Sequence, residues 1–110
     1  MSFEAKDVAL QLVKAFRDPL QRIREHDADL AKQLRRSVPS VLLNLGEGER
    51  RRGGDRLYHY DVAAGSAGEV RDSLAVARAW GYLDEATLAE LEPLVDRVLA
   101  MLWRLRNPKA

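Results

Sequence analysis

The stretch QLRRSVPSVLLNLGEGERRRGGD, residues 33–55, decides how this chain folds. Its first half places apolar residues at three- and four-residue spacing, which is the pattern of a helix that buries one face. Its second half holds four glycines and three consecutive arginines, a composition typical of a turn. We therefore expect one helix from about Leu30 to about Gly46 and another that begins near Asp55.

Helical periodicity continues on both sides of this stretch. Apolar residues recur at helical spacing over residues 8–23, and Pro19 should bend or split that segment near residues 17–18, because proline has no backbone donor. Two further helices are expected over about residues 55–80 and 84–106.

Capping residues should mark the ends of these helices. Asp27 or Asp29 is expected to cap the second helix, and Asp84 the last one, because a short acceptor side chain satisfies free backbone N–H groups. Gly81 should take the left-handed conformation after the third helix.

Nothing in the chain alternates apolar and polar residues as a strand would. We expect an all-α fold, an antiparallel up-down four-helix bundle, with residues 1–110 as a single domain. Gly65 and Gly68 lower the helix propensity of the third segment. We expect that these small residues stand there because another backbone packs close to them.

Composition and charge narrow the class of protein. There is no cysteine, no signal peptide pattern and no run of about 18 apolar residues, so we expect a soluble cytoplasmic protein without membrane contact. The net charge is only +1, yet residues 32–56 hold seven basic against three acidic residues and are therefore +4. Such a basic run is either solvated surface or a contact for phosphates.

Catalytic and metal-binding motifs are missing from the sequence. The glycine-rich turn contains neither a P-loop nor a dinucleotide-binding pattern. Ser66 lies in a near match to the nucleophile elbow G-x-S-x-G, but Ala64 replaces the first glycine. His26 and His59 lack the Glu-x-x-His spacing of di-iron bundles, and His59 with Asp55 would make at most half of a metal site. We expect no enzyme activity, no metal and no cofactor.

The segment QLRRSVPSVLLNLGEGERR resembles the second helix of the 23S rRNA intervening-sequence proteins, also called four helix bundle proteins. That family carries two arginines followed by Asn-x-x-Glu-Gly, then Ala-x-Gly-Ser-x-x-Glu in its third helix, then Gly-Tyr-Leu before its last helix. The matching residues are Arg35, Arg36, Asn44, Glu47, Gly48, Ala63, Gly65, Ser66, Glu69, Gly81, Tyr82 and Leu83. The resemblance covers about residues 30–105.

The resemblance implies an antiparallel four-helix bundle that assembles into a homopentamer. Some relatives are encoded inside insertions in bacterial 23S rRNA genes. The fold is also similar to that of the accessory protein of diversity-generating retroelements, a basic pentameric barrel that binds nucleic acid and a reverse transcriptase. An oligomer of this chain should bury apolar surface such as Trp80, Tyr82 or Trp103 between subunits.

Antiparallel pairing of the second and third helices gives the signature residues architectural roles. Glu47 should lie beside the N-terminus of the third helix, where the helix dipole favours an anion. Arg36 should come within reach of Glu69, and Gly65 with Ser66 should allow the two helices to approach closely.

Two functions stay open. Binding of RNA or DNA, directly or as an adaptor, would use Arg50, Arg51, Arg52 and Arg56, and several copies of this loop in an oligomer would form a ring of positive charge. The alternative is a protein-binding oligomeric scaffold with no nucleic-acid contact. The near-zero net charge and an aromatic content of 6 % weigh against the first function, because few bases could stack on rings.

Overall fold

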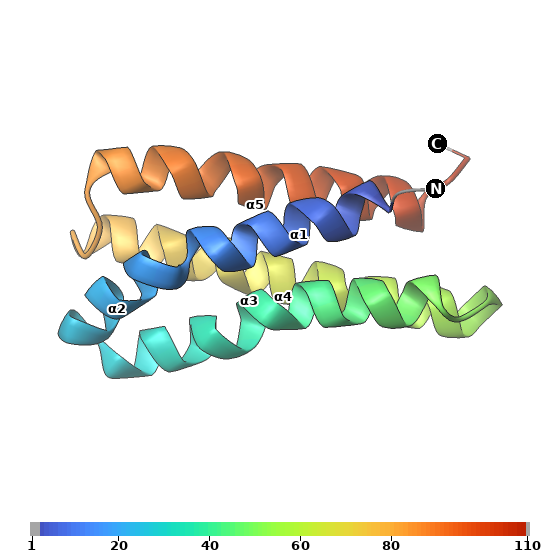
Figure 1. Ribbon diagram of the computed structural model, residues 1–110, viewed down its shortest axis with the longest axis horizontal. Helices are drawn as coiled ribbons and strands as arrows, with labels where there is room; N and C mark the ends of the chain where they lie inside the picture. The colour runs from blue at the N-terminus through green and yellow to red at the C-terminus, as the bar shows by residue number, and fades with distance from the viewer. Residues whose placement is uncertain (1–2, 110) are drawn as a thin grey trace.

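The computed structural model describes residues 3–109, and this part of the chain is helical apart from short connections. It contains five helices and no strand: α1 (Glu4–Ala15), α2 (Arg17–His26), α3 (Ala28–Glu49), α4 (Gly53–Ala79) and α5 (Glu85–Arg106) (Figure 1). The all-α class is therefore confirmed. The helices number five, where four were expected, because the first predicted segment is divided in two.

The division falls at Phe16, one residue before the predicted position. Pro19 has no N–H group to donate to the Ala15 carbonyl, so the helical hydrogen-bond pattern is interrupted in this turn. Phe16 still donates its N–H to Leu12 O at 3.1 Å, and Leu20 donates to Phe16 O at 2.9 Å. Pro19 then lies in the first turn of α2, which leaves the line of α1 and leads toward the start of α3 (Figure 1).

Capping residues occupy their predicted positions. Asp27 and Asp84 each accept a hydrogen bond from the backbone N–H three residues further on, at 3.0 Å and 2.8 Å, and so begin α3 and α5. Gly81 has φ +73°, the left-handed conformation that glycine adopts without strain.

The long helices lie side by side in an elongated molecule of 42 × 22 × 22 Å (Figure 1). α3 packs along α4, α4 along α5, and α1 contacts both α3 and α5, while α2 packs on α3. One buried cluster includes Phe16, Leu34 and Leu91, and a second includes Leu45 and Leu102. The α2–α3 surface thus lies at one end of the molecule, and the turn between α3 and α4 lies at the other.

Close approach of α3 and α4 occurs at a different glycine from the predicted ones. A Cβ added at Gly65 or Gly68 would meet no heavy atom within 4 Å, so these two glycines do not serve close packing. A Cβ at Gly48 would overlap the Tyr60 ring, which is buried. The position that sterically requires glycine is therefore Gly48, in the signature Glu-Gly at the end of α3. Helix propensity alone does not distinguish this glycine from Gly65 and Gly68.

Two of the three aromatic residues expected between subunits are exposed. Trp80 is 72 % exposed and Trp103 is 53 % exposed. Tyr82 is half-buried, because its ring stacks on His26 with 5.3 Å between centroids and its hydroxyl donates to Asp27 Oδ2 at 3.3 Å. Tyr82 therefore stabilises the α4–α5 connection against the start of α3.

Candidate nucleic-acid interface

The turn between α3 and α4 carries the arginines that the sequence predicts as nucleic-acid contacts. Arg50 and Arg51 donate to the two oxygens of the Glu47 carboxylate, at 2.9 Å and 3.2 Å. The hydrogen bond from Arg50, followed by that from Arg51, lowers the pKa of the Glu47 carboxyl. Two of the three loop arginines therefore share one carboxylate, which reduces the net positive charge of the loop.

Glu47, predicted as the anion beside the N-terminus of α4, accepts hydrogen bonds from Arg50 and Arg51 and makes no capping hydrogen bond to that N-terminus. Its carboxylate is turned toward its own helix end, because side chains three and four residues apart lie on one face of a helix. The N-cap residue of α4 is Arg52, and no side chain caps this N-terminus. Arg52 is exposed and forms no ion pair within residues 3–109.

Arg56, the fourth predicted contact, has a structural role. Its guanidinium donates to Gly48 O at 2.9 Å and to Glu49 O at 3.0 Å. These are carbonyls of the last turn of α3, which have no partner within their own helix. Arg56 therefore caps α3 from the neighbouring helix.

A chain of polar side chains crosses the interface between α3 and α4. Ser40 Oγ and Ser66 Oγ are 2.8 Å apart, and Asn44 Nδ2 donates to Ser40 O at 3.0 Å. Asn44 Oδ1 lies 3.1 Å from His59 Nδ1. Because the amide nitrogen of Asn44 is used as a donor, its oxygen accepts, and the proton of a neutral His59 is assigned to Nδ1. Asn44 and Ser66 of the signature thus align the two helices.

The predicted Arg36–Glu69 ion pair is absent, and α3 packs on α4 in a different register from the predicted one. The predicted pairing sets Ser66 opposite residue 36, whereas Ser40 takes that place, one helical turn further along α3. Arg36 and Glu69 line the same groove between α3 and α4, yet neither forms an ion pair within the part of the chain that the structure describes. The two residues thus share one groove, without an ion pair between them.

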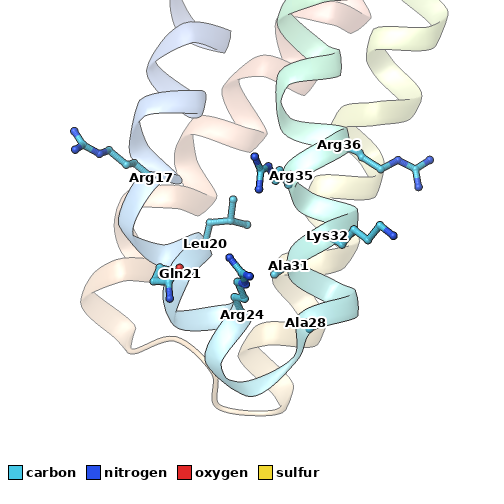
Figure 2. A pocket seen from close by; sticks show the side chains of 9 residues that line it. All are labelled: Arg17, Leu20, Gln21, Arg24, Ala28, Ala31, Lys32, Arg35 and Arg36. Carbon is cyan, nitrogen blue, oxygen red and sulfur yellow. The ribbon is translucent and has the colours of Figure 1, made fainter.

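A second cluster of positive charge lies in a groove of about 650 Å³ between α2 and α3, which we call the basic groove (Figure 2). Its apolar floor includes Leu20 and Ala31, and Arg24 and Arg35 point into the gap from opposite helices (Figure 2). None of its lining residues is acidic. Its basic side chains are Arg17, Arg24, Lys32, Arg35 and Arg36.

The basic groove differs from the rest of the surface in how its charges are paired. Within residues 3–109, eight lysine or arginine side chains form ion pairs with carboxylates, and none of the eight lines this groove. Arg24 and Arg35 point into the gap with no anionic partner among the described residues, whereas Arg17, Lys32 and Arg36 point away from it (Figure 2). Such an arrangement favours a bound anion.

Other classes of site find no support in the described residues. Between residues 3 and 109, no group of three or more Asp, Glu, His or Cys side chains is placed to hold a metal ion. In the same range, no helix has an apolar stretch long enough to cross a membrane.

Comparison with known families gives one match. The family model described as 23S rRNA-intervening sequence protein covers residues 2–104. The chain belongs to this family. Comparisons with curated proteins and with solved structures found no match.

Membership of the 23S rRNA-intervening sequence family confirms the resemblance carried by the signature residues, but that signature does not reveal the basic groove. Arg35 and Arg36 are signature residues, whereas Arg17 and Arg24 come from the first predicted segment. The signal that could have found them is the helix break at Pro19, because it turns α2 toward α3. The neighbouring acids Asp18 and Glu25 offset the charge of these arginines, so the net charge of the segment does not indicate a basic site.

Proposed function

We propose that this chain is a non-enzymatic helical-bundle protein that binds the phosphate backbone of RNA or DNA in its basic groove. The observation that carries the proposal is the pair Arg24 and Arg35, which point into the groove between α2 and α3 from opposite helices, in a lining that holds three more basic residues and no carboxylate (Figure 2). We also interpret the fold as an antiparallel up-down four-helix bundle in which α1 and α2 together take the place of the first helix, interrupted at Phe16.

Phosphate chemistry fits this groove better than the loop predicted from sequence. Arg24 and Arg35 face each other across the gap, so two guanidinium groups can hold neighbouring phosphate oxygens. In the loop, a phosphate would have to compete with Glu47 for Arg50 and Arg51. Arg52 remains available there, so we propose the loop as an additional contact.

A homo-oligomer, with a pentamer as the family resemblance implies, would multiply these contacts. Trp80 and Trp103 supply exposed aromatic surface for contacts between subunits. Several grooves on one particle would bind one nucleic-acid strand with a raised effective concentration. The weak net charge of +1 per chain is then no obstacle, because binding depends on the local field.

A protein-binding scaffold is the second candidate, and the floor of the same groove favours it. Leu20, Ala28 and Ala31 offer apolar surface between the cations. An acidic amphipathic helix could lay its apolar face on this floor and its carboxylates on the arginines.

A binding titration separates the two candidates. Fluorescence polarisation at low salt with labelled RNA, duplex DNA and single-stranded DNA should give weak, poorly sequence-specific binding that Arg24→Ala with Arg35→Ala reduces. Absence of binding to all three nucleic acids would reject the proposal and leave the scaffold.

A further inference from the structure

The groove between α3 and α4 holds polar groups that phosphate binding in the basic groove does not use. It measures about 510 Å³, a size within the range of small-ligand sites. Lys32 and Arg36 line both grooves, and in Figure 2 they point away from the gap between α2 and α3. A strand held in the basic groove would therefore have this second groove on the other side of α3.

Ser37 places a buried hydroxyl without a hydrogen-bond partner at the edge of the α3–α4 groove. The residue lines the groove and is 4 % exposed, yet its hydroxyl oxygen has no hydrogen-bond partner within residues 3–109. A buried hydroxyl without a partner destabilises the fold. Neighbouring Ser40 and Ser66 satisfy each other at 2.8 Å, so neither of them is the partner of Ser37.

Glu69 and Arg36 define which ligand fits. Both side chains are exposed and line the groove, and neither is in an ion pair within the described residues. Both are therefore available to bind a ligand. A carboxylate offers two adjacent acceptors, and a guanidinium or ammonium group offers donors. The Watson–Crick edge of guanine presents two adjacent donors, N1–H and N2–H, beside one acceptor, O6. Adenine, cytosine and uracil present no pair of adjacent donors beside an acceptor.

We propose that the α3–α4 groove takes an unpaired guanine base of a single-stranded nucleic acid. Glu69 accepts from guanine N1–H and N2–H, while Arg36 or Lys32 donates to O6. Single-stranded bases expose this edge, whereas in a duplex it is already paired. The inference rests on the proposed phosphate binding, because the basic groove brings the strand to α3.

Labelled oligothymidines that carry one central guanine, adenine, cytosine or no substitution test this directly by polarisation at low salt. The guanine strand should bind at least about 5-fold more tightly than the others, the lower limit for a bidentate base contact. Glu69→Gln should abolish that preference, because an amide replaces one acceptor with a donor.

Glu90→Gln is the matched control, because Glu90 is an exposed carboxylate on α5 that lines neither groove. Equal affinity for all four strands, or a guanine preference that survives Glu69→Gln, would overturn the inference. If the guanine preference is missing but binding still depends on salt, the proposal of phosphate binding in the basic groove stands. If no strand binds at all, both the guanine inference and the proposed phosphate binding are rejected. Free GMP competing as well as the guanine strand would overturn the single-strand assignment in favour of a free nucleotide.

Discussion

Gly48 lies where α4 leaves no room for a side chain on α3. A methyl group at this position would overlap the buried Tyr60 ring, so Gly48→Ala should destabilise the protein by about 1–3 kcal/mol, as overpacking does. Gly65→Ala is the matched control, because its Cβ would meet nothing within 4 Å and should stabilise the helix by about 0.5–1 kcal/mol. Urea denaturation measures both, and equal midpoints for the two variants would contradict the packing described.

Glu47 is the second residue whose role is testable alone. Arg50 and Arg51 lower the pKa of its carboxyl, so the ion pair stabilises the fold at neutral pH. That contribution is present above the pKa of Glu47 in the unfolded chain and is lost as the pH falls through its lower pKa in the folded chain.

Glu47→Gln should therefore lower the denaturation midpoint slightly near pH 7 and have no effect in strong acid, since exposed ion pairs contribute little. Melting curves across this pH range, with and without salt, provide the measurement. A difference between wild type and variant that grows toward acid pH would have the wrong sign.

At the scale of the helices, Arg56 joins α4 to the end of α3. Arg56→Ala should leave the Gly48 and Glu49 carbonyls without this donor and lower the unfolding free energy by about 1 kcal/mol. Arg52→Ala is the comparison, because Arg52 is exposed and unpaired within the described chain, and its loss should leave stability unchanged. An Arg56 variant as stable as the Arg52 variant would show that the cap contributes nothing.

Helix positions follow from sequence where local chemistry decides them. Asp27, Asp84 and Gly81 act at short range, and each marks a helix end as predicted. The end of α3 was placed near Gly46, whereas the helix continues to Glu49. Arg56 of α4 caps the extended end of α3, and this is a contact that periodicity within one segment cannot reveal. The same three-residue extension accompanies the shifted register, in which Ser66 lies opposite Ser40 and not opposite residue 36.

At the scale of the whole molecule, the basic groove exists only because α2 packs on α3. Residues 17–25 contain three arginines and two acids, so this segment alone is +1 and gives no sign of a site. Folding brings its Arg24 across the gap from Arg35 and places Arg17 in the same lining, while the acids stay outside it. The family signature locates α3 in the sequence, but it does not locate α2, which forms the other side of the basic groove.

Assembly is the remaining property of the whole molecule. We expect size-exclusion chromatography with light scattering to give about 62 kDa, five times the 12.4 kDa of one chain. Trp103→Glu should shift the mass downward if this exposed ring lies between subunits. A mass of one chain that does not change with concentration would reject the oligomer.

The salt dependence of nucleic-acid binding tests the basic groove most directly. Each phosphate contact contributes about −0.7 on a single strand to the slope of log affinity against log salt. Arg24→Ala with Arg35→Ala should therefore flatten the slope by about 1.4 per bound chain. Arg71→Ala with Arg97→Ala removes two arginines that are already paired with Asp96 and Glu4, and it should change the slope little. The same slope in wild type and the groove variant, or equal flattening in both variants, would contradict phosphate binding in the basic groove.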